Sequence, residues 1–371
     1  MKERIYKQIR EIINKFIKKD YWNEFSSADI FYFDDSKKKK TMITFIDSFF
    51  GEAYGIQFFI NKDGFNYVHD ILTCQNPDMI SIGDCDSICA VLSSKEDLTP
   101  TDIKFLKSCN ARIKEENNLL IYRFKKGYAQ RLANLEELNM VLSRLDYLGC
   151  IIANEYVDIK AAFENGYSAI AYVDLEKYLY HISYHPLPFL ESNPRVKPIN
   201  ENFVNEYKDS TFINDECYLF TSYLPIIVKE TGVRPILLYF YYADSGKTFL
   251  KFIIDEPKTY YDYIFGILDD VFIKVGKPTK MIFNNRDFYY FTKKTLSSLQ
   301  IECVKTDNNE YVDENISNVI SRVFEKTGDD VIEKESAALL LIETLTNVIN
   351  EIESYDTEDD EKNDNDNLVS W

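Results

Sequence analysis

The order of hydrophobic and polar positions predicts interspersed helices and strands along most of the chain. Near the N-terminus, apolar side chains recur every three or four residues over 3–19 and leave a lysine-rich opposite side, which predicts an amphipathic helix docked on a domain. This stripe consists of Ile5, Ile9, Ile12, Ile13, Phe16 and Ile17. Segments with strand composition follow at 41–47 and 54–60, and further strands are expected at 88–92 and 119–124.

Capping signals mark the starts of two further helices. Thr99 stands before Pro100, a residue favoured at the first helical position, and Asp102 follows three residues after Thr99, as in a capping box. Asn134 is placed to cap a long helix that reaches about residue 165, because leucines recur at intervals of three and four. A β-hairpin that turns at 174–177 is expected next.

Four prolines between Pro186 and Pro198 mark the predicted boundary between two domains. We assign residues 1–190 to an α+β domain, 191–204 to a proline-rich linker and 205–328 to a second domain. In the second domain we expect strands near 216–222, 236–243 and 248–254, with a tight turn at 244–247. A helix at about 258–274, a strand–helix–strand unit over 276–307 and a last helix to about 327 follow. This is the element order of an RNase H-like α/β domain.

The chain beyond residue 328 is expected to hold an amphipathic helix over 329–354 and a disordered acidic tail over 355–371. The helix has two heptads, which is short for a coiled coil, so we expect it to dock on the body of the protein. Self-association and insertion into a partner groove remain open alternatives. The apolar stripe of this helix consists of Ala338, Leu341, Leu345, Val348 and Ile352.

The formal net charge of −18 is concentrated near the C-terminus. Residues 329–371 carry 14 acidic residues and two lysines, which leaves a net charge of −6 for residues 1–328. A strongly acidic surface repels phosphate backbones, so we do not expect nucleic-acid binding. The run Lys37–Lys40 is interpreted as a solvated turn between two strands, and a phosphate-binding role is the alternative.

The seven cysteines are scattered, and several lie in apolar segments where a thiol acts as a small hydrophobic group. This usage is typical of a cytoplasmic protein. No stretch approaches 18 apolar residues, and the N-terminal helix lacks an uninterrupted apolar core. We therefore expect neither a membrane span nor a signal peptide.

Three segments carry a resemblance to a known family: "YWNEFSSADIF", "GEAYGIQFFINKDGFNYV" and "LTPTDIKFLKSCNARIKEENNLLIYRFKKGY". They resemble an uncharacterised family of bacterial proteins with two successive domains of unknown function, over roughly residues 20–325. The resemblance implies that the second domain is RNase H-like. Some relatives carry a cysteine-rich zinc module at the C-terminus, where this chain has its acidic segment. No family activity or site residue is implied.

The carboxylates that a metal-dependent nuclease needs are mostly absent from the expected positions. Two-metal hydrolysis requires several carboxylates around two cations about 4 Å apart. The expected strand at 280–285 finishes with Asn284 and Asn285, which are neutral. Asp287 is placed to cap the next helix. The remaining candidate acids either precede the first strand of the domain or lie in the tight turn, namely Asp215, Glu216 and Asp244.

Other motifs that could hold a metal are weak. His181 and His185 are four residues apart, but on a strand this spacing separates them by about 13 Å, which is too far to hold one ion. Cys85 and Cys89, with Cys74 upstream, have no second CxxC-type pair. We expect no metal and no cofactor.

The sequence therefore predicts a non-enzymatic binding or scaffold protein of unknown ligand, with a degenerate RNase H-like domain. One alternative is a divergent metal-dependent nuclease or nucleic-acid-processing factor that uses Asp215, Glu216, Asp244 and Asp287. Another is an assembly factor that acts through the helix at 329–354.

Overall fold

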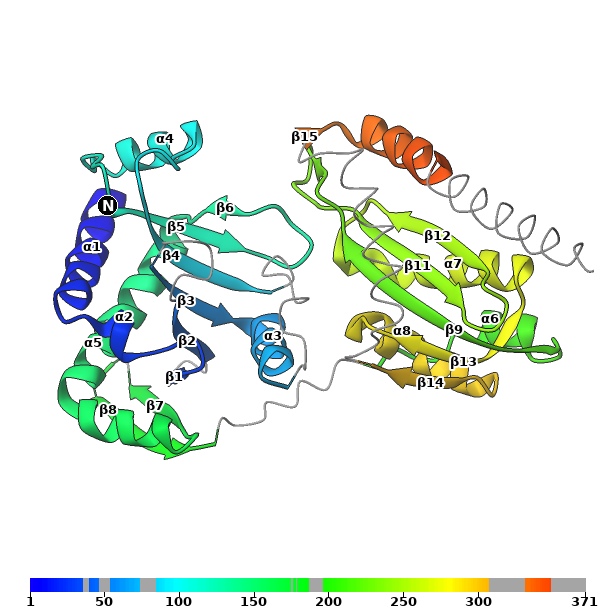
Figure 1. Ribbon diagram of the computed structural model, residues 1–371, viewed down its shortest axis with the longest axis horizontal. Helices are drawn as coiled ribbons and strands as arrows, with labels where there is room; N and C mark the ends of the chain where they lie inside the picture. The colour runs from blue at the N-terminus through cyan, green and yellow to red at the C-terminus, as the bar shows by residue number, and fades with distance from the viewer. Residues whose placement is uncertain are drawn as a thin grey trace, which may run out of the picture. The chain divides into compact units, whose positions relative to one another are not determined.

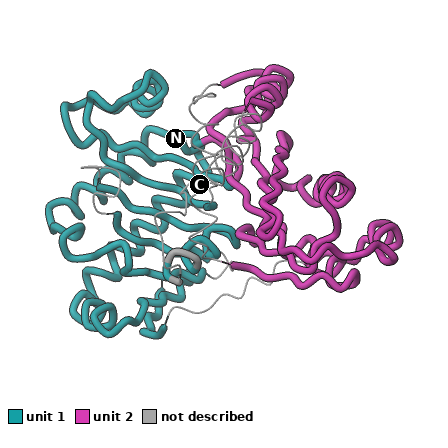
Figure 2. The backbone as a smooth tube through the Cα atoms, turned by 45° about the vertical axis from the view of Figure 1, so that its right-hand side comes forward, with its two compact units in different colours: residues 1–126, 130–192 teal, residues 127–129, 193–371 magenta. Residues whose placement is uncertain are grey.

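The computed structural model of the protein describes residues 1–35, 40–46, 54–73, 85–174, 176–177, 179–186, 196–306 and 331–347. The chain divides into two compact units, shown in Figure 2: unit 1 is residues 1–126 and 130–192, and unit 2 is residues 127–129 and 193–371. Lys37–Lys39, most of the proline-rich stretch, the helix expected to end near 327 and the acidic segment 355–371 lie outside the described residues.

Unit 1 is built on an eight-stranded sheet with the order β6-β5-β4-β3-β2-β1-β7-β8. Neighbouring strands pair antiparallel, except that β1 and β7 pair in parallel. The strands are β1 (Phe31–Asp35), β2 (Lys40–Ile46), β3 (Gly55–Ile60), β4 (Ser87–Ser93), β5 (Asn118–Phe124), β6 (Arg131–Leu132), β7 (Ser168–Asp174) and β8 (Leu179–His185).

Helices cover both faces of this sheet, which explains the long apolar runs in its strands. Phe31 and Phe33 of β1 point to a core shared with α1 and α5, whereas Tyr32 between them points to a smaller core shared with α3. Figure 1 shows α1 and α5 together on one side of the sheet. The helices are α1 (Lys2–Lys18), α2 (Tyr21–Glu24), α3 (Asn61–Thr73), α4 (Pro100–Ser108) and α5 (Leu135–Glu164).

The predicted helix starts at Thr99 and Asn134 are confirmed. Thr99 Oγ1 accepts a hydrogen bond from the Asp102 backbone N–H at 3.2 Å, and an Asp102 oxygen accepts from the Thr99 N–H at 2.9 Å. Asn134 and Glu137 make the same reciprocal pair at the start of α5. Each capping box satisfies two backbone donors that the helix itself leaves unpaired.

Unit 2 is built on a five-stranded sheet with the order β12-β11-β9-β13-β14. Strands β12, β11 and β9 pair antiparallel, whereas β9, β13 and β14 run parallel. Helix α7 leads from β12 to β13, and α8 leads from β13 to β14. The elements are α6 (Glu201–Tyr207), β9 (Phe212–Tyr223), β11 (Ile236–Tyr242), β12 (Thr248–Ile253), α7 (Tyr260–Lys274), β13 (Lys277–Phe283), α8 (Arg286–Ser298) and β14 (Glu302–Lys305).

Two separate cores sandwich this sheet. One face packs against α6, α7 and α8, and the other packs against a helix at 334–347, drawn in orange in Figure 1. Ala337, Leu341 and Leu345 are the buried apolar residues of that helix. Just before it, β15 (Val331–Ile332) pairs in parallel with β10 (Ile227–Val228). Residues 334–347 of the predicted C-terminal helix therefore dock on the sheet, and Val348 and Ile352 lie outside the described residues.

Two features of unit 2 differ from the sequence prediction. Helix α6 begins at Glu201, inside the segment assigned as linker, because Asn200 caps it and Phe203 and Tyr207 bury one side of it. Strand β9 begins at Phe212 rather than near 216, because pairing with β13 starts at the Phe212–Lys277 position. Asp215 and Glu216 therefore lie within the strand and do not precede it.

Candidate functional site

A cluster of neutral polar side chains lies at the C-terminal end of β13, beside β9. The Asn284 side chain acts like one more residue of the ladder, because its oxygen accepts from the Thr221 N–H at 3.0 Å and its NH₂ group donates to the Thr221 carbonyl at 3.4 Å. The Asn285 NH₂ group donates to Thr221 Oγ1 at 2.9 Å. We call Thr221, Asn284 and Asn285 the strand-end cluster.

Asn285 also starts helix α8. Its side-chain oxygen accepts from the backbone N–H groups of Asp287 at 2.9 Å and Phe288 at 3.3 Å, which makes Asn285 the N-cap. The prediction that Asp287 caps this helix is wrong by two residues, because β13 ends at Phe283 and the chain turns immediately. Asp287 lies in the first turn of α8, where an acid interacts favourably with the helix dipole.

Asp215 holds the turn between β11 and β12. The side chain is 4% exposed, and its two oxygens accept from the Asp244 N–H at 2.9 Å, the Ser245 N–H at 3.1 Å and Ser245 Oγ at 2.8 Å. Two of the predicted candidates, Asp215 and Asp244, therefore meet, but through a backbone amide of Asp244. This contact fixes a hairpin and leaves the Asp215 carboxylate with three donors.

The other candidate acids are not brought to the same place. Glu216 forms an ion pair with Lys280 at 3.1 Å, halfway along β13. Asp287 lies beyond the C-terminal end of β13, and the strand from Lys280 to Phe283 spans roughly 10 Å. Among the described residues, no group of three or more His, Cys, Asp or Glu side chains could hold a metal ion.

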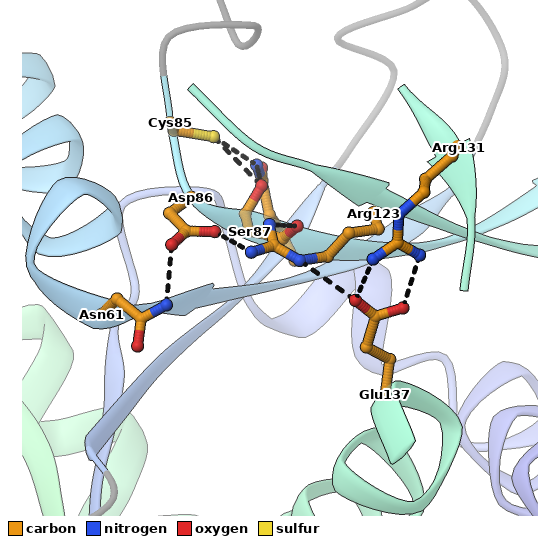
Figure 3. Close-up of polar contacts among 8 residues, drawn as sticks. Asn61, Cys85, Asp86, Ser87, Arg123, Arg131 and Glu137 are labelled. Carbon is orange, nitrogen blue, oxygen red and sulfur yellow. Dashed lines mark hydrogen bonds and ion pairs between the residues drawn. The ribbon is translucent and has the colours of Figure 1, made fainter. Parts of the chain in front are cut away.

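Unit 1 contains a second polar cluster, in which Arg123 of β5 is the central residue (Figure 3). Its guanidinium forms an ion pair with Asp86, lies 3.3 Å from the Glu137 carboxylate and donates to the Ser87 carbonyl at 3.1 Å. The Arg123 and Asp86 side chains are about nine-tenths buried. Asn61, at the start of α3, donates to Asp86 at 2.7 Å.

Glu137 links this cluster to the surface and to helix α5. Arg131 makes two hydrogen bonds to its carboxylate, at 2.8 and 2.5 Å, and the Asn134 N–H adds a third. Burial by itself raises the pKa of Glu137, but the hydrogen bonds from Arg131 and Asn134 and the charge of Arg123 outweigh it and lower that pKa. The carboxylate is thus held in its charged form as a structural anchor between β5, β6 and α5.

Nearby thiols and hydroxyls are packed rather than reactive. Cys85 and Ser87 are fully buried and lie 3.0 Å apart, and Gln57 donates to Ser87 Oγ at 3.1 Å. Burial raises the pKa of the Cys89 thiol to about 12, so this thiol does not ionise near neutral pH. Cys74 lies outside the described residues. His181 and His185 lie on strand β8, as the spacing argument requires.

A surface hollow of about 600 Å³ lies where the parallel strands β1 and β7 end. Its three carboxylates already have partners: Asp35 binds Arg144 at 2.8 Å, Asp34 lies 4.0 Å from Lys40, and Asp174 accepts from backbone groups of its own turn. The remaining lining residues are Tyr172, Val173, Leu179, Tyr180 and His181. These contacts account for the positions of the three carboxylates without a bound ligand.

One family model matches part of the chain, within unit 1. A domain of the family DUF7309, described as a domain of unknown function, spans residues 6–167. This confirms the expected domain of unknown function in the first half of the chain. No curated protein matches the chain. Among the described residues, no helix combines the length and apolar character needed to cross a membrane.

One similar solved chain comes from the cryo-EM structure of the simian T-cell lymphotropic virus intasome in complex with PP2A regulatory subunit B56 gamma. The two chains are 12% identical, with a TM-score of 0.25. The similarity covers 36% of this chain and 50% of that chain, so this chain spans half the length of its relative. A similarity at this TM-score carries no argument about fold or function.

Proposed function

We propose that this protein is a non-enzymatic binding or scaffold protein whose second unit is a degenerate RNase H-like domain. The observation that carries the proposal is the strand-end cluster. At the end of the central parallel strand pair, where carboxylates would have to meet to hold two cations, unit 2 has two amides and a hydroxyl that bond to one another.

The topology of unit 2 supports the RNase H-like assignment. Three antiparallel strands come first in the sequence, then two strands that extend the sheet in parallel on the other side of β9. Each parallel strand is reached through a helix, α7 or α8. Strand order and direction therefore agree with the element order that suggested the fold from the sequence.

The hydrogen bonding of unit 2 supports the non-enzymatic part of the proposal. A hydrolytic centre needs full negative charges to hold its dications, and amide groups supply only partial charges. The Asn284 and Asn285 side chains are also occupied as donors and acceptors toward Thr221 and α8. Asp215, the most buried candidate acid in unit 2, is occupied by the β11–β12 turn.

A cytoplasmic location belongs to the same proposal. The described cysteines Cys85, Cys89, Cys109, Cys150, Cys217 and Cys303 are free thiols. Thiols persist in reducing compartments, which supports this location.

Calorimetric titration of the full chain with Mg²⁺ and with Mn²⁺ tests the proposal directly. We expect no saturable uptake, and no cleavage of single-stranded, duplex or hybrid nucleic acid in the presence of either ion. Saturable binding of one or two ions together with cleavage that Asp287→Asn abolishes would establish the divergent nuclease instead. Asp262→Asn is the matched control, because Asp262 is an exposed acid in the first turn of α7 and is not among the candidate acids.

The helix at 334–347 supports assembly as a second candidate function. Leu339 and Ile342 are three residues apart on its outer side, and they are 69% and 55% exposed. Leu341 and Leu345 of the predicted stripe are buried against the sheet, so a partner would meet the outer residues first. If assembly uses this side, Leu339→Glu with Ile342→Glu will lower the sedimenting mass of the full chain, and an unchanged mass would count against it.

A further inference from the structure

The eight-stranded sheet of unit 1 has two very different ends. At one end, β6 is two residues long and carries Arg131. At the other, β8 is seven residues long, and within the described residues it pairs only with β7. A strand at the end of a sheet presents a row of unpaired backbone N–H and C=O groups, which makes it a template for another strand.

The sequence of β8 lacks the usual protection of such an edge. Proteins commonly block edge strands with lysine, other charges, proline or extreme shortness. The segment from Leu179 to His185 reads LYHISYH and contains no lysine, arginine, acid or proline. Leu179, His181 and His185 are exposed and the other four residues are half-buried, and Leu179 is 62% exposed.

One face of β8 is symmetric about its centre. Tyr180 and Tyr184 are each two residues from Ile182, and all three pack against the same core, whereas on the other face His181 is mirrored by Ser183. If two copies of β8 pair antiparallel about Ile182, Ile182 meets itself and Tyr180 meets Tyr184 on the same side of the joined sheet. A two-fold interface requires such self-complementarity, because the same surface serves both copies.

We propose that β8 is a homodimerisation edge, at which two copies of this chain join their eight-stranded sheets into one continuous antiparallel sheet centred on Ile182. Cross-strand aromatic pairs stabilise antiparallel strands, and this register forms two tyrosine pairs. Any other strand could pair with the backbone, but a second copy also sets its Tyr184, Ile182 and Tyr180 opposite Tyr180, Ile182 and Tyr184. The proposal does not depend on what unit 2 binds.

Charge adds a second expectation. The chain has a formal net charge of −18, so two copies repel each other at long range, whereas β8 itself carries no formal charge at neutral pH. Salt screens the repulsion without weakening an uncharged backbone ladder. Dimer formation should therefore strengthen as the ionic strength rises, in contrast to an interface held by ion pairs.

Cysteine crosslinking of the full chain tests the register. In a Cys150→Ser background, which removes an exposed thiol, Ile182→Cys brings two thiols to the symmetry axis with Cβ atoms about 5 Å apart. Leu179→Cys is the matched control, because the same register separates its two copies by roughly 20 Å. With oxidised glutathione as oxidant, we expect a disulfide-linked dimer from Ile182→Cys and only glutathione adducts from Leu179→Cys.

A second measurement does not rely on added cysteines. Light scattering over about two decades of concentration should show the full chain approaching twice its monomer mass. His181→Lys with Ser183→Lys sets lysines opposite each other across the two-fold axis. The protein concentration at which half of the chains are dimeric should rise at least about tenfold. Tyr172→Lys, which adds a charge one strand inward, should change this concentration by no more than about twofold.

Several results would overturn the proposal. A monomer at every concentration would do so, as would equal crosslinking at residues 179 and 182. A dimer that the two β8 lysines leave intact but that Leu339→Glu with Ile342→Glu abolishes would assign association to the C-terminal helix. Circular dichroism of each variant shows whether it is folded, so that loss of the dimer is not mistaken for loss of the sheet.

Discussion

Unit 1 buries fully charged side chains, whereas the strand-end cluster of unit 2 is made of neutral ones. Arg123, Asp86 and Glu137 form ion pairs inside unit 1, and a separate pair joins Arg144 to Asp35. In unit 2, Thr221, Asn284 and Asn285 reach each other with amide and hydroxyl groups. Both arrangements tie a helix to the sheet, but only the first has to offset the desolvation of full charges.

This difference shows that buried charged side chains do not by themselves indicate a catalytic site in this protein. The buried charges of unit 1 lie among strands and capped helices, and each has a structural partner. The position in unit 2 where hydrolysis would need charge has none. A buried acid is therefore not evidence of a catalytic site in either unit, since Asp215 of unit 2 is also occupied by structural donors.

Removing the central cation of unit 1 should have the largest effect on stability. Arg123→Met leaves Asp86 and Glu137 as partly unpaired buried carboxylates, and we expect a loss of about 3–5 kcal/mol in the free energy of unfolding. Arg131→Met is the control: Arg131 is 52% exposed, so the loss should stay below about 1 kcal/mol. Urea denaturation measures both, and equal losses would show that Arg123 is not the central residue.

The next effect concerns how closely α3 approaches the Arg123 cluster. A Cβ atom added at Gly64 would lie 2.3 Å from the backbone oxygen of Asp86, so Gly64→Ala must move the helix. We expect a loss of about 1–3 kcal/mol. Gly266 of α7 has open space around it, so Gly266→Ala should stabilise unit 2 by about 0.5–1 kcal/mol. Thermal unfolding of the two variants should therefore shift in opposite directions.

The strand-end cluster should respond differently at its two asparagines. Asn284→Asp removes the NH₂ donor to the Thr221 carbonyl and sets a carboxylate near that oxygen, with an expected loss of about 1–2 kcal/mol. Asn285→Asp keeps the N-cap acceptor, and the Thr221 hydroxyl can turn to donate, so its effect should stay within about 0.5 kcal/mol. Equal losses in urea denaturation would contradict the ladder-like role of Asn284.

The smallest expected effect is the pH dependence of the docked C-terminal helix. Hydrogen bonds from Lys334 and then Tyr263 lower the pKa of Asp255 below its usual value of 3.8. The ionised Asp255 therefore contributes its full stabilisation of the docked helix above pH 3.8. This stabilisation is lost as the pH falls through the lower pKa that Asp255 has in the folded state. The pair is partly exposed, so we expect less than about 1 kcal/mol.

Hydrogen exchange can detect this pH effect. Amides of residues 334–347 should exchange faster relative to α7 as the pH falls below 3.8, and Asp255→Asn should remove that dependence. The same pH dependence in the Asp255→Asn chain would assign it to another group.

Local signals in the sequence determined much of the fold. The starts of α4 and α5 follow from residues within one helical turn, because a capping box needs only two residues three apart. Helices α1 and α7 and the β13–α8–β14 unit follow from apolar spacing for the same reason. The neutrality of Asn284 and Asn285, and hence the expectation that unit 2 lacks a dication centre, also needed no structure.

Tertiary structure decided which distant residues meet. Arg123 and Asp86 are brought together by pairing of β4 with β5, and Thr221 and Asn284 by pairing of β9 with β13. Register is a long-range property, since a slip of one residue turns every side chain to the other face of the sheet. The sequence therefore determined the kinds of groups available, and the folded sheets alone decided their partners.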